Sequence, residues 1–334
     1  MLVTFIALHI NFAQIAKRNS AQSYCDIIMR IIGVAYSLPI IIAIIDALSI
    51  YKLLPMTVHA IIQQVFGGWQ LGRPVGTTAE ASWLASHMLF AFCCYLYLAM
   101  RHNGKYRVRC IASAALFLLT QSLQGVGLFA IGCLIFVFLY ARTIKNGAKV
   151  IRAIIKVLVL VAFVCYIFYK LLMLNPETYF ASRVLNFSNL NRLLSNEGSS
   201  FVRIIGALIN VPIFAENQLF GIGGFGHYYL VEDYIRKYFP TAIRFASMTR
   251  NSSITLYLRI LAEHGLLGGL LYYNFFFYCL KRTRHIVQFK YSALVLFWIS
   301  ISLALNFQFA SYAYTLPLVA LAFVMDIPQM TENV

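Results

Sequence analysis

Charge is scarce in this chain. Only 11% of its 334 residues are charged, whereas 61% are hydrophobic, and the mean hydropathy is +0.75. A soluble domain needs more charge than this to cover its surface, and a disordered chain has far fewer apolar residues, so the composition excludes both classes. It predicts an all-α, polytopic integral membrane protein, with residues 1–334 forming a single transmembrane domain.

Acidic residues are the scarcest of the charged ones. The chain has 11 Asp and Glu against 27 Lys and Arg, which gives a formal charge of +16. A similar excess is found in nucleic-acid-binding proteins, but here much of it falls in short clusters between apolar segments. That distribution is typical of cytoplasmic loops in membrane proteins, so no nucleic-acid partner is implied. The clusters lie at 17–18, 101–109, 142–156 and 281–290.

Cysteine spacing gives no indication of a metal site. The seven cysteines lie in or beside apolar segments and form no CxxC or Cys/His pattern, so we interpret them as small core residues. No metal and no cofactor is therefore expected. The apolar run Met1–Ala16 lacks a basic leader and a small-residue cleavage site, so no cleavable signal is expected either.

The apolar segments predict about nine membrane spans. Basic clusters place the loops near 17–30, 101–109, 142–156 and 281–290 on the cytoplasmic side. The two longest polar segments, 51–82 and 174–254, then lie outside the cytoplasm, since long loops cross a membrane largely regardless of charge. The predicted spans are 1–16, 31–50, 83–100, 109–122, 125–141, 153–173, 255–280, 291–310 and 313–326, with a tight turn near Gln121–Gln124.

The predicted outer loop 174–254 is rich in arginine, which is costly beside a bilayer and suggests an anionic partner. The segment 201–214 is apolar but too short to span, and it favours an interfacial or re-entrant helix. Arg203 would then lie near the headgroups, where its guanidinium either binds a phosphate in bidentate fashion or simply contacts lipid. Both interpretations stay open. The other candidate ligand-binding residues of this loop are Arg183, Arg192, His227, Arg244, Arg250 and Asn251.

Glycines recur in the middle of this loop, at Gly221–Gly226. No strand precedes them and no βαβ unit surrounds them, so a dinucleotide site is not expected. They instead permit a tight turn that brings His227 back over the membrane. The aromatic residues that follow, between 228 and 245, suit either stacking on sugar rings or an interfacial aromatic belt, with the belt favoured.

The apolar segment after the loop carries two opposite charges. Arg259 and Glu263 are four residues apart and therefore share a helix face, where they form either a structural ion pair or part of a catalytic site. His264 is a weaker general-base candidate. Asp46 and His87 are expected to be hydrogen-bonded polar residues of the core. In the first outer loop, Arg73 is either a further candidate for binding an anion or a residue that simply ends the loop.

Taken in order, these segments resemble the O-antigen polymerase and ligase family of membrane glycosyltransferases. The resemblance covers roughly residues 70–280, and no single motif in it is strict. The segments that carry it are Arg-Pro-x-Gly at 73–76, LLTQS…GVGLFAIG at 118–132, SSFVRIIGALINVPIFAENQLFGIGGFGHYY at 199–229 and NSSITLYLRILAEHGLLGGLLYY at 251–273.

The resemblance implies a polymerase of lipid-linked repeat units, located in the bacterial inner membrane with its active site facing the periplasm or cell exterior. Such an enzyme builds O-antigen of lipopolysaccharide, capsule or exopolysaccharide from undecaprenyl-diphosphate-linked oligosaccharides, and it acts beside a flippase and a chain-length regulator. Arg203 and Glu263 would be catalytic, and Arg73 would bind the diphosphate. Ligases of the family carry His-Asn where this chain has Arg250-Asn251, and the missing histidine disfavours a ligase. A ligase and a transporter or flippase of lipid-linked sugars are the alternatives.

Overall fold

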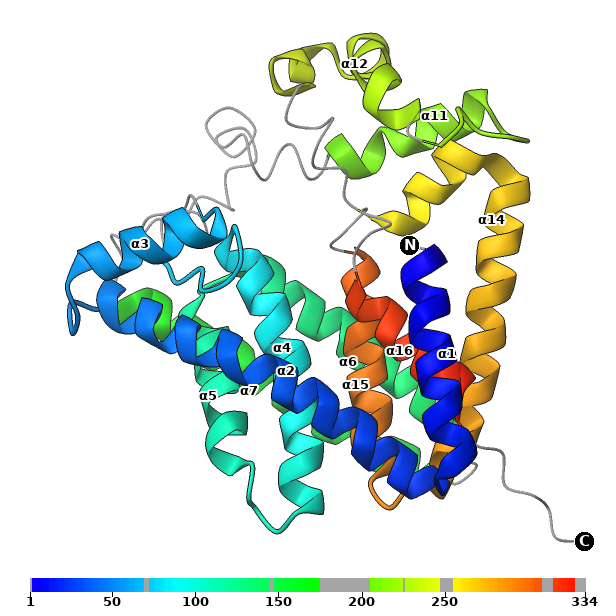
Figure 1. Cartoon of the computed structure of the whole chain (residues 1–334). Coiled ribbons are helices and arrows are strands. Elements are labelled where there is room, and N and C mark those ends of the chain that lie inside the picture. The colour runs from blue at the N-terminus through cyan, green and yellow to red at the C-terminus, as the bar shows by residue number, and fades with distance from the viewer. Residues whose placement is uncertain are drawn as a thin grey trace, which may run out of the picture. The chain divides into compact units, whose positions relative to one another are not determined.

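The computed structural model describes residues 2–68, 72–143, 147–174, 205–224, 226–246, 255–307 and 315–327, and every regular element within these ranges is a helix (Figure 1). The chain divides into two compact units. We call residues 2–171, 282–304 and 316–334 the bundle unit, and residues 172–281 and 305–315 the loop unit.

The helices of the bundle unit are mostly long and apolar. They are α1 (Leu2–Arg18), α2 (Ala21–Ile50), α3 (Met56–Phe66), α4 (Ala81–Arg101), α5 (Arg107–Leu119), α6 (Leu123–Thr143), α7 (Gly147–Leu174), the short η2 (Thr283–Gln288), α15 (Ser292–Ala304) and α16 (Thr315–Met325).

The core of the bundle unit lies where α4, α6, α15 and α16 pack together. Trp298 of α15 is fully buried, with its ring centroid 5.4 Å from that of Phe90 and 5.5 Å from that of Phe323. On α6, a Cβ added at Gly132 would lie 2.3 Å from Cδ1 of Ile301, so the absent side chain sets how closely α6 and α15 approach. Small residues at such contacts are typical of helices that pack in membranes.

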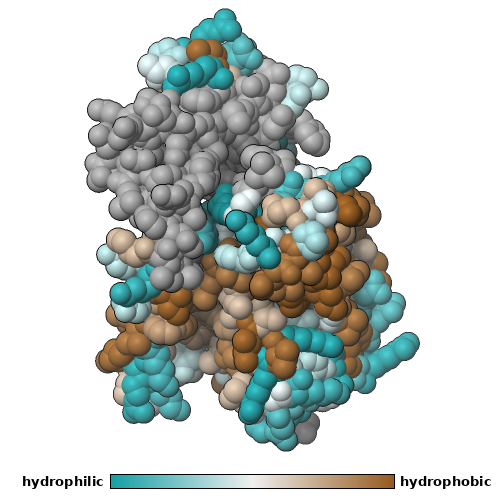
Figure 2. All heavy atoms as spheres, turned by 90° about the vertical axis from the view of Figure 1, so that its left-hand side faces the viewer, coloured by the Kyte–Doolittle hydropathy of each residue, from teal (hydrophilic) through white to brown (hydrophobic). Residues whose placement is uncertain are grey.

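In the described part of the chain, four helices are long and apolar enough to cross a bilayer: α2, α4, α6 and residues Gly147–Ile167 of α7. Shorter apolar helices cover Ile205–Glu216, Ser292–Phe307 and Leu316–Met325. Apolar side chains are exposed over much of the face drawn in Figure 2, with hydrophilic residues among them and around them. On α2 these exposed residues include Ile31, Val34 and Leu38, between 52% and 72% exposed. Helices of this kind are those of a membrane protein; the predicted number of nine spans remains a prediction.

Two local predictions differ from the structure. The segment near 17–30 is not a loop, because α2 begins at Ala21, where the Ser20 hydroxyl accepts a hydrogen bond from the Ser23 amide (3.3 Å) and caps the helix. The polar segment 51–82 contains the unpredicted helix α3. The tight turn between α5 and α6 is confirmed, with Gln121 at a φ of 45°.

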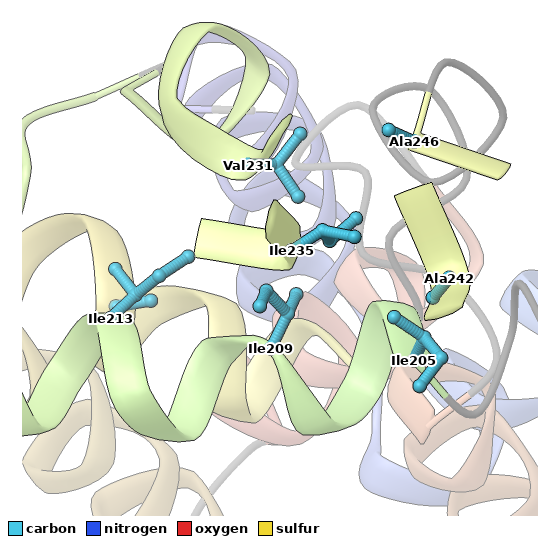
Figure 3. Packing of buried hydrophobic residues seen from close by; sticks show 8 residues of the cluster. Ile205, Ile209, Ile213, Val231, Ile235, Ala242 and Ala246 are labelled. Atoms are coloured by element: carbon cyan, nitrogen blue, oxygen red, sulfur yellow. The ribbon is translucent and has the colours of Figure 1, made fainter. Parts of the chain in front are cut away.

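The loop unit is helical in its described part. It contains α11 (Asn210–Glu216), α12 (Gly226–Tyr238), the 3-10 helix η1 (Pro240–Phe245), most of α14 (Leu256–Arg282) and η3 (Leu305–Phe307). Figure 3 shows isoleucines spaced four residues apart on one helix pointing towards α12 and η1. This small apolar core consists of Ile205, Ile209, Ile213, Val231, Ile235, Ala242, Ala246 and Ala262. The sequence predicted a helix at 201–214, and the structure describes one from Ile205 onwards.

Candidate functional site

Helix α14 is broken at Gly265, and the glycine-rich loop fills the break. Gly265 has a φ of 63° and a ψ of −162°, so the helical hydrogen bonds across it are lost. In an unbroken helix the Leu266 and Leu267 amides would donate to the carbonyls of Ala262 and Glu263. Here those four groups bond to residues 218–223 instead.

The exchange of partners is complete. The Ile222 and Gly223 amides donate to the carbonyls of Ala262 (3.0 Å) and Glu263 (2.8 Å). In return, the Leu266 amide donates to the carbonyl of Gln218 (2.7 Å), and the Leu267 amide donates to that of Leu219 (3.3 Å). A buried backbone group that a kink leaves without a hydrogen-bond partner destabilises the fold. The glycine loop supplies a partner for each of the four groups.

Two glycines make this contact possible. A Cβ at Gly221 would lie 2.4 Å from the carbonyl carbon of Glu263, and a Cβ at Gly265 would lie 2.4 Å from that of Leu219. Both residues also have positive φ angles, 68° and 63°. The sequence predicted a tight turn at Gly221–Gly226; what it did not reveal is that the turn contacts Gly265, because nothing in the pattern pairs two glycines 44 residues apart.

Glu263 lies directly at this break and is fully buried. Its Oε1 is 3.0 Å from both Nε and Nη2 of Arg259, whose side chain is 15% exposed. Removal of either partner from a buried ion pair of this kind is strongly destabilising, because the remaining charge stays buried without compensation. The predicted Arg259–Glu263 pair is therefore present, and its partnering suits both the structural and the catalytic interpretation.

His227 lies in the interior of the loop unit. It is one turn before Val231 and two turns before Ile235 on α12, and it shares their buried face with 0% exposure. Within the described chain neither ring nitrogen has a hydrogen-bond partner. Burial, and after it the positive charge of Arg259, lowers the pKa of His227 to about 4. A contact between this ring and a substrate would require the interior to open.

The lowered pKa makes the loop unit acid-sensitive. The pKa of this histidine is 6.5 in the unfolded chain and about 4 in the folded chain. As the pH falls from the first value to the second, the free energy of unfolding therefore decreases, by on the order of 3 kcal/mol. His227→Leu should remove this loss and be at least as stable as the wild type at pH 8, because the ring nitrogens have no partners to lose. Hydrogen exchange of α12 between pH 8 and pH 4 measures both, and equal acid sensitivity in the two proteins would contradict the prediction.

The charged residues around α12 lie at its surface. Glu216 accepts a hydrogen bond from Nζ of Lys237 (2.5 Å) and another from the hydroxyl of Tyr238, and these bonds lower the pKa of its carboxyl group. Arg236 pairs with Glu232 one turn away (3.4 Å), and Arg244 is exposed on η1. Exposed pairs of this kind contribute little to stability.

Arg73 belongs to the bundle unit. Its Nη1 donates to the backbone carbonyl of Gln121 (3.5 Å), in the turn between α5 and α6. The turn that carries Arg73 is bound by Asp46, which is hydrogen-bonded as expected. The other oxygen of Asp46 accepts from His59, a residue that no pattern in the sequence singled out. His87 is also partnered as expected, since its Nδ1 lies 2.9 Å from the Tyr36 hydroxyl.

Five predicted site residues lie outside the described residues: Arg183, Arg192, Arg203, Arg250 and Asn251.

No family model, no curated protein and no solved structure matches this chain. Among the residues that the structure describes, no group of three or more His, Cys, Asp or Glu is placed to hold a metal ion.

Proposed function

We propose that this chain is a membrane glycosyltransferase that polymerises lipid-linked oligosaccharide repeat units into a surface polysaccharide. The observation that carries the proposal is the junction between the glycine loop and the break in α14. The two segments with the most distinctive motifs, at 199–229 and 251–273, meet there through four backbone hydrogen bonds. This gives the order of motifs a physical meaning, because each segment supplies the partners that the other lacks.

The reaction in this proposal takes place outside the cytoplasm. A hydroxyl oxygen of the acceptor repeat unit forms a bond to the anomeric carbon of the donor chain. The bond from that carbon to the diphosphate oxygen breaks, its electron pair leaves with undecaprenyl diphosphate, and the hydroxyl proton passes to a base or to water. No metal or nucleotide sugar is needed, because the lipid diphosphate is already an activated leaving group.

Arginine is the residue that suits this leaving group best. Charge on the diphosphate grows as the bond breaks, so a fixed guanidinium stabilises the transition state more than the ground state. We assign this role to Arg203 and Arg73, with Arg183, Arg192, Arg244 and Arg250 binding the lipid-linked substrates. Asn251 would assist as a polar ligand.

Glu216, His227 and Glu263 of the loop unit are the candidates for the base, and their surroundings differ. Glu216 is engaged by Lys237 and Tyr238, which makes it a weaker base. His227 is neutral but buried, so it supports the fold of the loop unit more directly than it could contact a sugar. Glu263 is also buried, and it is paired with Arg259, so contact with a sugar would require the interior to open here too. We keep it as the catalytic candidate because it lies at the break in α14, where the two motif segments meet.

The proposal places the protein in the bacterial inner membrane, with about nine spans and with the loop 174–254 facing the periplasm or cell exterior. Its substrates are undecaprenyl-diphosphate-linked oligosaccharides, and its neighbours would be a flippase and a chain-length regulator. The apolar helices support the membrane location, and the basic clusters between the apolar segments support the orientation.

Deletion of the gene tests the proposed function against its rivals. Loss of a polymerase should leave single repeat units on the final acceptor, because ligation continues without extension. Long chains stranded on undecaprenyl diphosphate would instead indicate a ligase, and single units facing the cytoplasm would indicate a transporter. Gel analysis of surface glycan and mass spectrometry of the lipid-linked intermediates distinguish the three outcomes.

A further inference from the structure

Asp46 is a buried carboxylate whose two oxygens bind two different segments of the bundle unit. It lies near the end of α2 with 0% exposure. Its Oδ2 accepts hydrogen bonds from the backbone amides of Val75 (2.7 Å) and Gly76 (2.8 Å). Its Oδ1 accepts one from Nδ1 of His59 on α3 (2.6 Å). A carboxylate would be costly at this depth, and these bonds offset the cost.

His59 extends the same network. The ring is 1% exposed, and its Nε2 lies 2.9 Å from the side-chain nitrogen of Gln63, one turn further along α3. With Nδ1 donating to Asp46, Nε2 is left to accept from the Gln63 amide. The carboxylate thereby fixes the tautomer and orientation of the ring, and α3 is held against the end of α2.

The turn bound by Asp46 is packed as tightly as it is hydrogen-bonded. Val75 is fully buried, and the Thr78 hydroxyl donates to the carbonyl of Val75 (2.7 Å). A Cβ added at Gly76 would lie 3.0 Å from that of Ala43 on α2, which explains why this position has no side chain. Two consecutive amides pointing at one oxygen form an anion-binding concavity, which the chain's own carboxylate occupies.

Arg73 immediately precedes this bound turn. Only Pro74, which is buried and whose ring restricts the backbone, separates it from the Val75 amide. On its other side the Arg73 guanidinium donates to the carbonyl of Gln121. The position of Arg73 is therefore determined at two points, by Asp46 through the backbone and by the turn between α5 and α6 through the side chain.

We propose that Asp46 and His59 are positioning residues that hold the Arg73–Gly76 turn and thereby fix the guanidinium of Arg73 for binding an anionic group of the substrate. The inference depends on the proposed function for the identity of that group, a lipid diphosphate. The hydrogen-bonded turn itself does not depend on that function.

The first measurement needs no activity. Hydrogen exchange of the purified protein, read by mass spectrometry over residues 72–80, should show the Val75 and Gly76 amides protected in the wild type. Asp46→Ala should raise their exchange at least tenfold, while peptides of α6 and α15 keep wild-type rates. Ser49→Ala is the matched control, because Ser49 is equally buried on the same turn of α2 but bonds only to its own helix, at Ile45. Unchanged exchange at 72–80 in Asp46→Ala would overturn the inference.

A second variant separates positioning from a need for negative charge. Asp46→Asn keeps an oxygen that can accept from both amides, and its amide nitrogen can donate to His59 if the ring takes the other tautomer. It should retain protection at 72–80 and at least a third of wild-type polymerisation in membranes supplied with lipid-linked repeat units. Intact protection with activity as low as in Asp46→Ala would overturn the positioning role. If Asp46→Ala does not accumulate, His59→Ala replaces it and should raise exchange in the same peptide at least threefold.

Non-additivity is the closing test. If Asp46 acts through Arg73, then Asp46→Ala should lower kcat/KM for the donor about as much as Arg73→Ala does, and the double variant should be no worse than Arg73→Ala alone. Independent, multiplying losses would overturn the inference. So would normal polymerisation by Arg73→Ala, and the gene-deletion phenotype would then show separately whether the proposed function still stands.

Discussion

Gly221→Ala is expected to detach the glycine loop from α14 and to abolish the activity of the protein. The new methyl group would meet the backbone of Glu263 at 2.4–2.5 Å, and backbone at the centre of a kink cannot move aside as a flexible side chain would. The φ of 68° adds strain for any residue with a Cβ. Together these effects should destabilise the loop unit by on the order of 3 kcal/mol.

Hydrogen exchange measures this effect at individual backbone amides. The Ile222, Gly223, Leu266 and Leu267 amides should lose protection together, because each bonds across the junction. Gly265→Ala should release the same four amides, and the double variant should be little worse than either single one, since both break one contact.

Gly224→Ala is the matched control for the junction. It adds the same methyl group three residues along the same loop, but the nearest atom would be a ring carbon of His264 at 3.6 Å, an ordinary van der Waals contact. Near-wild-type exchange and activity are expected. If Gly221→Ala behaved like Gly224→Ala, the close contact between the loop and Glu263 would be wrong.

Periodic apolar segments made the helices of the bundle unit predictable. The runs at 83–100, 109–122 and 125–141 correspond to α4, α5 and α6 within a few residues, because a long apolar run in a chain this poor in charge has few other ways to satisfy its backbone. Helix α2 extends ten residues before its predicted start at 31. The polar residues there misled the prediction, because their side chains are bonded to neighbouring elements: Asp26, for instance, accepts hydrogen bonds from Tyr97 and Arg101.

The sequence indicated which residues belong to the site, but in most cases it did not indicate which residues contact one another. Asp46 was expected to be a hydrogen-bonded core residue, which is confirmed, but its partners lie 13, 29 and 30 residues away on segments with no common pattern. The Arg259–Glu263 pair follows from helical spacing alone and was found. The contact of Gly221 with Glu263 and Gly265 depends on the backbone conformation of the glycine loop and of the break in α14. A single sequence does not show that these two conformations fit together.

Arg203→Ala is expected to abolish chain extension without loss of protein. In the proposed reaction its guanidinium stabilises the diphosphate as the glycosidic bond breaks, and removing one preorganised donor of this kind costs about 100- to 1,000-fold in rate. Arg203→Lys should recover only a small part, because an ammonium keeps the charge but loses the bidentate geometry. Gel analysis of polymer length in a strain lacking the chromosomal gene measures both, with the amount of protein checked by immunoblot.

Arg236→Ala is the control that makes the Arg203 result interpretable. It removes the same side chain and the same charge from the same predicted outer loop, but Arg236 is a surface residue of α12, with a side chain 68% exposed and paired to Glu232 only one turn away. If the loop merely needed positive charge near the lipid headgroups, the two alanine variants should lose activity to a similar extent. If Arg203 binds the diphosphate, only its variant should fail to extend chains. Polymer of normal length from Arg203→Ala would remove the residue from the mechanism and leave lipid contact as its role.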